Sequence, residues 1–412
     1  MSQTSKRGAV CYEAESSSIL GEDITTFSTF RVPIVGKVDC SGLKEEKIDS
    51  DKVTQRRQEG SQWIRTTVGG SFKLKFSLPG HGSSTAGAGL ALSARETLLG
   101  RVLGNVALSA AAGTTYTGGT ATVPTTTASG TFSAGSLVAS GVLGDGRGNG
   151  QIHAIATHVG ASMTLLTGLG AAPSNGDLAR APTVLYPSES FGSTAIQGTR
   201  FLLQTANLQY ECHGCVCTGW EITGQNDGEV LHVDTTWEVA WWRYSTATFP
   251  SAVASDTFVP AACAAGSLFV ADVGTATRAS NTRTCRDFKL DWKLGVQLLY
   301  GPGGFHPQQK LIGAVRTIDE IKVSWTEDAD SATTTPVLPG YGTGTNFKHL
   351  LRTWNTTDGK QMAFYAPNFC ITNVPVQFDD NGINRLRVEG MCYTGTTTTN
   401  DLTMSAGRLA FA

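Results

Sequence analysis

The chain has 412 residues, of which 40% are hydrophobic and 16% charged, and its formal net charge is −2. This length is enough for two or three domains with apolar cores. The near-neutral charge argues against a protein that grips nucleic acid through clustered Lys and Arg. The 48 glycines and the many threonines favour strands and turns over long helices.

The sequence also bears on targeting, membrane insertion and the state of the cysteines. No apolar run follows the first residues, and no apolar stretch of about 18 residues occurs, so we expect neither a signal peptide nor insertion of this chain into a membrane. The nine cysteines form no regular framework. We therefore expect reduced thiols and synthesis in a cytoplasm.

A segment of mixed charge comes first along the chain, at residues 43–60. A solvated loop is the simplest interpretation of such a segment. The alternative is a loop that contacts a neighbouring subunit. It arises because a contrasting Gly-, Pro- and aromatic-containing segment, residues 299–307, stands at the same place relative to the strand that follows.

Two strands of the same type follow these segments. Residues 72–76 read Phe-Lys-Leu-Lys-Phe and residues 321–325 read Ile-Lys-Val-Ser-Trp, so both alternate large apolar with polar side chains. This period of two predicts strands with one face on a core. Phe72, Leu74 and Phe76 are expected to face that core, with Ile321, Val323 and Trp325 as their counterparts.

Each strand is followed by a predicted short helix and then a hairpin. The helices are expected near residues 92–103 and 346–354, and the hairpins at residues 217–233 and 370–388. Strand, helix and hairpin thus occur twice, and such a repeat decides the architecture. The first copy is longer because residues 105–204, rich in Gly, Ala, Thr and Ser, intervene. We interpret that segment as a small inserted β-domain.

The most tempting metal-binding motif is Cys212-His-Gly-Cys215-Val-Cys217. A structural zinc site needs a second pair of ligands at comparable spacing, and none follows. On strand geometry Cys215 and Cys217 share one face while Cys212 points to the other. We favour buried thiols over a metal site, and predict neither a metal nor a cofactor.

Several local features occur in an order that resembles a known family. They are the charged segment at residues 43–62, the Gly-rich strand Val-Gly-Gly-Ser-Phe-Lys-Leu-Lys-Phe at 68–76, the helix at 91–103, the insertion and the returning hairpin at 210–241. Together they cover most of the chain. They are similar to the tail tube proteins of long-tailed bacteriophages, of the double-domain kind.

This resemblance implies a fold and domain boundaries. The expected fold is mainly β, with two tandem tail-tube-type β-sandwich domains, each with a short flanking helix, and a small inserted β-domain. The first domain would comprise residues 1–104 and 205–250, the inserted domain residues 105–204, and the second domain residues 251–412.

The resemblance also implies a function and partners. Members form rings whose inner sheets join into a β-barrel around a channel, and the rings stack into a tube. A chain with two copies would form a ring of three subunits with pseudo-sixfold symmetry. The expected setting is the virion tail, where the partners are copies of the chain, the tape measure and tail-end proteins, and double-stranded DNA that passes without specific binding.

Candidate site residues follow from this scheme, with no catalytic residue among them. The candidates for lining the channel are Lys73, Lys75, Asp319, Glu320 and Lys322. The candidates for contacts between stacked rings are Glu45, Glu46, Lys47, Asp49, Asp51, Arg56, Arg57, Tyr300, Phe305 and His306.

Two other classes of protein fit the sequence less well. One is a carbohydrate-binding β-sandwich adhesin, which the exposed aromatics and the Gly- and Thr-rich insertion would suit. Another is a different structural component of a virion, such as a capsid or baseplate protein. An enzyme is least favoured, because no nucleophile, base and orienting group can be assembled from the motifs.

Overall fold

We describe the protein from a computed structural model. The structure describes residues 9–15, 21, 27, 30–44, 46–49, 63–66, 69–78, 94–108, 114–127, 132, 137–141, 151–166, 168–180, 182–187, 198–205, 208–225, 230–253, 266–272, 282–283, 285, 287–300, 311–316, 319–328, 348–354, 362–374, 376–378, 384–393 and 405–411. This part of the chain is mainly β, which confirms the predicted fold class at that level.

Two units with the same strand connections follow one another along the chain. The strands of the first unit are β1 (Ala9–Ala14), β2 (Phe30–Pro33), β5 (Ser71–Ser77), β14 (Thr199–Thr205), β15 (Leu208–Gln225), β16 (His232–Glu238) and β17 (Trp241–Tyr244). Those of the second unit are β19 (Leu268–Asp272), β20 (Thr282–Arg283), β21 (Asp287–Lys293), β24 (Glu320–Asp328), β25 (Lys348–Trp354), β26 (Met362–Asn373), β28 (Asn384–Tyr393) and β29 (Arg408–Phe411).

The pairing pattern of the first unit recurs in the second. The first half of β15 pairs with β14 and β17, its second half pairs with β16, and β16 pairs with β5. In the second unit β26 pairs in the same way with β25, β29 and β28, and β28 pairs with β24. The two-stranded pairs β1–β2 and β19–β20 join β14 and β25 respectively. The repeated strand and hairpin seen in the sequence are therefore equivalent elements of structure.

The two units meet in one antiparallel sheet, which we call the shared sheet. Its order is β5-β16-β15-β21-β24-β28-β26, and the link between units is the pairing of β15 with β21. Neighbouring strands place buried residues in rows, so that Leu74, Thr235, Trp220, Trp292 and Ile321 are successive partners across five strands. A sheet with such rows has one continuous core face.

The alternation predicted for β5 and β24 is confirmed. Phe72, Leu74 and Phe76 are buried, and so are Ile321, Val323 and Trp325, whereas Lys73 and Lys322 are exposed. Each fully buried large apolar side chain contributes about 1.5–3 kcal/mol to folding. The face opposite the core carries mostly polar side chains, with Met391 and Cys370 in the row of Lys322 as apolar exceptions.

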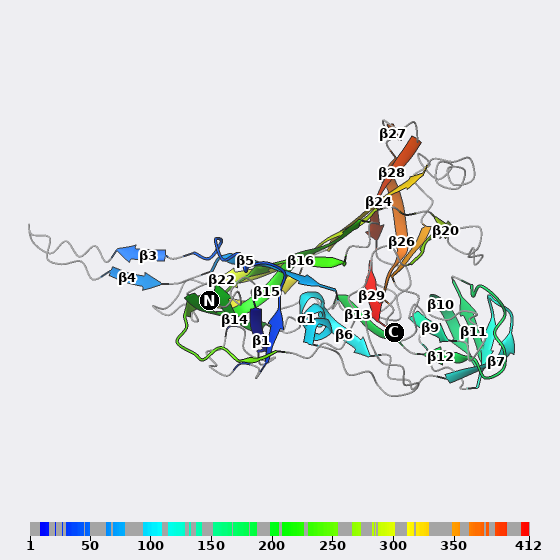
Figure 1. The fold of residues 1–412 in the computed structure, drawn as a ribbon, viewed down its shortest axis with the longest axis horizontal. Coiled ribbons are helices and arrows are strands. Elements are labelled where there is room, and N and C mark those ends of the chain that lie inside the picture. Colours follow the sequence, from blue (N-terminus) through cyan, green and yellow to red (C-terminus); the bar gives the residue numbers. More distant parts are fainter. Residues whose placement is uncertain are drawn as a thin grey trace, which may run out of the picture.

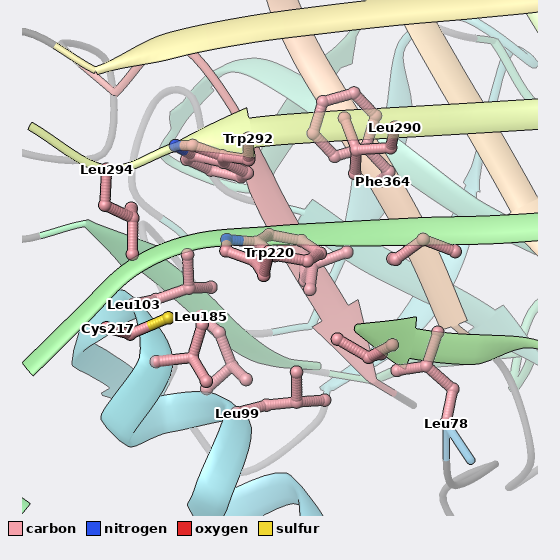
Figure 2. Packing of buried hydrophobic residues seen from close by; sticks show 14 of the residues in the cluster. Leu78, Leu99, Leu103, Leu185, Cys217, Trp220, Leu290, Trp292, Leu294 and Phe364 are labelled. Atoms are coloured by element: carbon pink, nitrogen blue, oxygen red, sulfur yellow. The ribbon is translucent and has the colours of Figure 1, made fainter. Parts of the chain in front are cut away.

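A single helix among the described residues, α1 (Ala94–Leu103), covers part of the first unit's core. Its apolar side chains Leu98, Leu99, Val102 and Leu103 are buried. Figure 2 shows Leu99 and Leu103 beside Leu185 and Cys217, beneath the strand that carries Trp220. This helix agrees with the predicted helix at residues 92–103.

The helix predicted near residues 346–354 is wrong, because residues 348–354 form strand β25. Leu350 and Leu351 are both buried, the first in the main core and the second in a separate cluster on the other face of the sheet. A strand buried on both faces lacks the alternation that marks a half-exposed strand, so its apolar run resembles a short helical segment. The second unit therefore has no flanking helix at the predicted place.

A closed six-stranded barrel lies within residues 114–180, in the order β10-β11-β8-β7-β12-β9. Its strands are β7 (Thr114–Gly119), β8 (Pro124–Thr126), β9 (Leu137–Gly141), β10 (Gln151–Val159), β11 (Ser162–Leu165) and β12 (Leu178–Arg180). The flanking strands β6 (Gly104–Leu108) and β13 (Thr183–Pro187) pair with each other, and β13 also pairs with β29. The barrel thus occupies a shorter segment than the predicted insertion at 105–204, whose ends belong to the large sheet.

The outer wall of the barrel packs on the second unit, although the barrel is inserted in the first. Leu137, Ala139, Ile152 and Ala154 of β9 and β10 share a buried cluster with residues of the second unit's outer strands. Those partners are Phe269, Leu351, Ala363, Tyr365 and Ala410, joined by Val184 of β13. The barrel and the second unit lie next to each other toward one end of the molecule (Figure 1).

Two further hairpins occupy equivalent places in the two units. One is β3 (Glu46–Asp49) with β4 (Trp63–Thr66), and the other is β22 (Val296–Tyr300) with β23 (Leu311–Arg316). Leu298 and Ala314 of β22 and β23 pack on Trp241 of the first unit. The β3–β4 hairpin instead projects from the body of the molecule (Figure 1). The short strands β18 (Ala252–Val253) and β27 (Val376–Phe378) complete the set, pairing with β2 and β28.

Candidate assembly surfaces

The polar face of the shared sheet is the first candidate surface. It carries charged side chains from β5, β15, β16, β21, β24 and β28, at the positions that alternate with the core residues. Among the side chains that the structure describes there, seven are basic and seven are acidic: Lys73, Lys75, Lys289, Lys293, Lys322, Arg385 and Arg387, against Glu221, Asp234, Glu238, Asp287, Asp291, Glu320 and Glu389. This face is therefore balanced in charge.

Ion pairs on the polar face join neighbouring strands or, for Lys322 and Glu320, two residues of β24. Lys75 Nζ lies 3.1 Å from Asp234 Oδ2, and Lys289 Nζ lies 3.0 Å from Glu221 Oε2. Lys293 and Lys322 both contact Glu320, at 3.3 Å and 2.7 Å. Exposed pairs of this kind contribute about 0–1 kcal/mol each. Their larger effect is that the lysines are engaged by carboxylates of the protein instead of being available to an anion.

Glu320 stands between two lysines, and its ionisation reflects them. Hydrogen bonds from Lys322 and Lys293 lower the pKa of its carboxyl below the usual value, and the bond to Glu320 raises the pKa of Lys322. Both groups therefore keep their charges across the neutral range.

Four of the five candidates for the channel lining share this face: Lys73, Lys75, Glu320 and Lys322. Asp319 differs, because its carboxylate accepts hydrogen bonds from Trp292 Nε1 at 3.2 Å and from the Gly295 amide at 3.0 Å. It anchors the end of β21 and the indole of Trp292. Which residues line a channel stays a prediction.

Most candidates for contacts between rings lie outside the described residues. These are Glu45, Asp51, Arg56, Arg57, Phe305 and His306. The backbone of Glu46, Lys47 and Asp49 lies in β3, and that of Tyr300 lies at the end of β22, while their side chains are outside the described part. The structure thus places the bases of both predicted contact loops on paired hairpins, and the role of the loops stays a prediction.

The two ends of the shared sheet are the second candidate surface. At one end residues 35–43 run along β5, with Asp39 opposite Lys73 and Leu43 opposite Gly70. At the other end residues 370–373 of β26 pair with β28 on one side. Among the described residues no strand pairs with the outer side of either segment. An unpaired strand edge is a template for pairing with another chain.

The internal junction between β15 and β21 shows how such edges meet. Seven residue pairs join these strands, from Gly219 opposite Lys293 to Gln225 opposite Asp287. The indoles of Trp220 and Trp292 stack across it, with ring centroids 5.1 Å apart (Figure 2). The ion pair between Lys289 and Glu221 bridges the same two strands on the polar face. The junction therefore combines backbone pairing, aromatic packing and charge.

The cysteine motif lies in the core and not at a surface. Cys212, Cys215 and Cys217 are all buried in the main apolar cluster, as predicted. The prediction that Cys212 faces the other way is wrong, because a bulge at Gly214, where φ is +61°, turns Cys212 and Cys215 to the same side. Burial raises the pKa of the Cys217 thiol to about 12, so it stays protonated and inert. Among the described residues no group of three or more His, Cys, Asp or Glu is placed to hold a metal ion.

A buried carboxylate fixes this bulge. Glu15 accepts hydrogen bonds from the amides of Gly21 and Gly214, at 2.7 Å and 2.6 Å, and Trp241 Nε1 donates to the Gly21 carbonyl at 2.8 Å. A charge with several backbone donors is stable in a dry site. The sequence pattern gave no sign of this arrangement, because Glu15 and Gly214 are distant along the chain.

No protein-family model matches the chain, and no curated protein matches its sequence. Within the described residues no helix is long and apolar enough to cross a membrane.

The sequence did contain a signal for the junction that our prediction missed. Residues 37–40 read Lys-Val-Asp-Cys, and residues 289–292 of β21 read Lys-Leu-Asp-Trp. Asp39 lies opposite Lys73 as Asp291 lies opposite Lys322. Residues 35–43 are the counterpart of β21 as an element, because each runs along the equivalent strand, β5 or β24.

Proposed function

We propose that this chain is a structural protein that assembles into closed rings, and that the rings stack into the tail tube of a long-tailed bacteriophage. The observation that carries the proposal is the relationship between the two ends of the shared sheet. One end is β26, the counterpart of β15, and the other is residues 35–43, the counterpart of β21. Inside the chain, β15 and β21 are paired with each other. Repeating that junction from copy to copy joins each sheet to the next.

Such an interface is head-to-tail, because two different edges meet. Head-to-tail contacts close into a ring when the rotation between copies permits, and otherwise continue as an open filament. Each copy contributes two equivalent units, so a ring of three chains has six units around its axis. Closure also removes both open edges, which would otherwise favour aggregation.

The polar face of the shared sheet suits the inner wall of such a ring. A surface that DNA must slide along should not bind phosphates tightly, and tight binding requires unneutralised Lys and Arg. The seven basic side chains described on this face are matched by seven described acidic ones, and several are held in ion pairs. The apolar face is occupied by the core and cannot serve this role.

The remaining parts of the proposal rest on the family resemblance. The tube would conduct double-stranded DNA to the host cell and would contact the tape measure protein and the proteins at its ends. The chain would have no enzymatic activity, and its place would be the virion tail after synthesis in the host cytoplasm.

Electron microscopy of the purified protein at high concentration tests the proposal. Rings or tubes with a central hole are expected. Monodisperse particles without a hole would contradict it, and binding of those particles to carbohydrate would favour the adhesin instead.

A further inference from the structure

We infer that the β3–β4 hairpin of one copy covers an apolar patch on the second unit of the next copy, with Trp63 as its main contact. The patch, which we call the hairpin site, consists of Pro367, Cys370, Met391 and Tyr393. The inference rests on the proposed self-association and adds to it a contact that sheet edges do not make. The occupant of the hairpin site is a second copy of this chain.

The same kind of contact exists inside the chain, between the other hairpin and the first unit. Leu298 of β22 and Ala314 of β23 form one buried cluster with Val216, Ala240 and Trp241 of the first unit. This hairpin follows β21, which pairs with the first unit. The β3–β4 hairpin follows residues 35–43, the counterpart of β21, and projects from its own body (Figure 1). The unit that it would cover therefore belongs to a neighbouring copy.

The residues of the two units can be matched through a bulge that both contain. The bulge interrupts the pairing of β15 with β16 and that of β26 with β28. In each unit the threonine at the bulge donates its Oγ1 to a carbonyl of the next strand, that of Thr236 at 3.3 Å and that of Glu389 at 3.2 Å. Thr236 and Glu389 are therefore equivalent, and so are their partners Lys73 in β5 and Ser324 in β24.

The two hairpins have the same register relative to this frame. β4 leads into β5 as β23 leads into β24, and by the residue count along the chain Trp63 corresponds to Ala314. Their partners across the hairpins, Asp49 and Leu298, correspond as well. Trp63 thus occupies the register position of the residue that packs with Trp241 inside the chain.

The hairpin site is the counterpart of the face that β22–β23 covers. Cys370 corresponds to Val216, because each lies two residues before the threonine of the bulge. Tyr393 corresponds to Ala240, because each lies two residues beyond the strand partner of Cys370 or Val216. Val216 and Ala240 are 4% and 0% exposed, whereas Tyr393 is 41% exposed and Cys370 is half-buried. The same face is covered in one unit and exposed in the other.

The large residue changes sides between the two contacts. In the first unit the sheet supplies Trp241 from β17, and the hairpin supplies Ala314. In the second unit the strand equivalent to β17 is β29, which begins with Arg408, the counterpart of Arg243 by residue count. No residue of β29 therefore stands at the place of Trp241, and the hairpin that would cover this place carries Trp63. One tryptophan is present at each contact, supplied by the sheet in one and by the hairpin in the other.

The chemistry of the hairpin site suits a tryptophan. Met391 stands where the first unit has Glu238, so the site lacks a charge whose desolvation would oppose covering. Methionine adapts its shape to an aromatic ring and makes favourable sulfur contacts with it. Tryptophan and tyrosine are also the residues in which the binding energy of protein interfaces is concentrated.

Cross-linking of the full chain tests the contact. The variant Trp63→Cys is treated with a short bifunctional maleimide, which can join the new thiol to the native Cys370 of a neighbour. We expect a ladder of covalent oligomers on a denaturing gel that contains reductant. Adding Cys370→Ser should abolish the ladder, and Ile64→Cys, on the opposite face of β4, should give far less of it. Ala314→Cys with Val216→Cys copies the pair inside one chain and should give an internally linked monomer.

Removing the tryptophan tests its contribution to association. Trp63→Ala should raise the concentration at which half the protein is assembled by roughly tenfold or more, measured by sedimentation, with a smaller effect of Trp63→Phe. Thermal unfolding of the dilute monomer should be unchanged, because the hairpin projects from its own body (Figure 1). Tyr393→Asp should impair assembly in the same way. Val159→Asp, at a position of the barrel that is 75% exposed, is the matched control and should assemble normally.

The outcomes separate the hairpin contact from the proposed function. Rings that form without the Trp63→Cys ladder, and at the same concentration in Trp63→Ala, would overturn the contact and leave self-association standing. A lower melting temperature of monomeric Trp63→Ala would also overturn it, since Trp63 would then pack within its own chain. Unaltered protein that stays monomeric at every concentration would overturn both. The ladder together with weakened assembly of Trp63→Ala and Tyr393→Asp supports both.

Discussion

The indole of Trp220 in the first unit stacks on the indole of Trp292 in the second, with centroids 5.1 Å apart and ring planes inclined by 29°. Both are buried, and Trp292 donates to Asp319 at 3.2 Å. Aromatic pairs of this kind are worth about 0.5–1.5 kcal/mol beyond the area they bury. The two units are therefore joined by a packed seam within one sheet.

Replacing Trp292 with Ala should lower the free energy of unfolding by about 3–5 kcal/mol, because it leaves a cavity at this seam. Trp292→Phe keeps a ring but removes the donor to Asp319, and should cost about 1–3 kcal/mol. Urea denaturation followed by circular dichroism measures both. Equal, small effects of the two substitutions would contradict a packed seam.

Removing carboxylates from the polar face should turn a surface that releases DNA into one that holds it. The variant combining Glu221→Gln, Asp234→Asn and Glu320→Gln leaves Lys289, Lys75, Lys293 and Lys322 without these ion-pair partners. Assembled variant should bind double-stranded DNA with a steep dependence on salt, measured by fluorescence anisotropy, while the unaltered assembly binds weakly. A control with Glu13→Gln, outside this face, should behave like the unaltered protein. Tight, salt-sensitive binding by the unaltered assembly would argue against an inner wall whose basic and acidic side chains are balanced.

The ionisation of Glu320 gives a pH-dependent prediction. Its pKa is lowered chiefly by the hydrogen bond from Lys322, so its contribution to stability is present above the ordinary carboxyl pKa and is lost as pH falls through the lowered value. Lys322→Met should raise the pKa of Glu320, with Lys293 retaining part of the effect. Lys75 contacts Asp234 instead, so Lys75→Met should leave the pKa of Glu320 unchanged. An NMR titration of the Glu320 carboxyl decides between these results, and an unchanged pKa in Lys322→Met would contradict the assignment.

The barrel should be separable from the assembly surfaces. Leu108 and Thr183 are opposed residues of β6 and β13, so joining these strands by an Asn-Gly turn in place of residues 109–182 makes a two-stranded hairpin. The shortened chain should fold and form rings, with lower solubility because Phe269, Leu351 and Ala363 lose their cover. Adding Leu351→Thr should recover solubility. Size-exclusion chromatography and microscopy report the result, and unfolding of both shortened chains would show that the barrel is part of the core.

Deleting residues 45–58 should leave a folded, soluble protein that no longer polymerises into tubes. The deletion removes the β3 strand and most of the charged segment while leaving residues 35–43 and β5 in place. Exposed ion pairs are weak singly but act together when repeated around a ring and along a tube. Circular dichroism checks the fold and electron microscopy checks assembly. Tubes of normal length would refute a role for this segment in stacking.

The sequence allowed the mainly β class, the two core-facing strands and the repeated hairpin to be predicted, because alternating side chains on a half-exposed strand leave a local pattern. The prediction failed for β25, because Leu350 and Leu351 are buried on opposite faces and the strand shows no alternation. The predicted direction of the Cys212 side chain was also wrong, because a bulge at Gly214 changes which face of β15 the following residues point to, and the residue pattern does not reveal the bulge. Local periodicity reports exposure, and these two elements depend on contacts made elsewhere in the chain.

The assembly surfaces were predicted only in part. The charged positions on β5 and β24 followed from alternation, but Asp319 is held by Trp292 and Gly295 through a contact that no spacing reveals. The counterpart of β21 was missed because residues 35–43 bend at Gly36 and join β5 through isolated bridges, so they do not show the pattern of a regular strand. Only the strand pairings make the two halves comparable residue by residue.

The most direct test of the central claim is the number of chains in one ring, counted by cryo-electron microscopy of the assembled protein. We predict three chains, with six similar units around the axis and the shared sheets joined edge to edge. Six chains per ring, or an assembly in which the edges at residues 35–43 and 370–373 do not meet, would contradict the account.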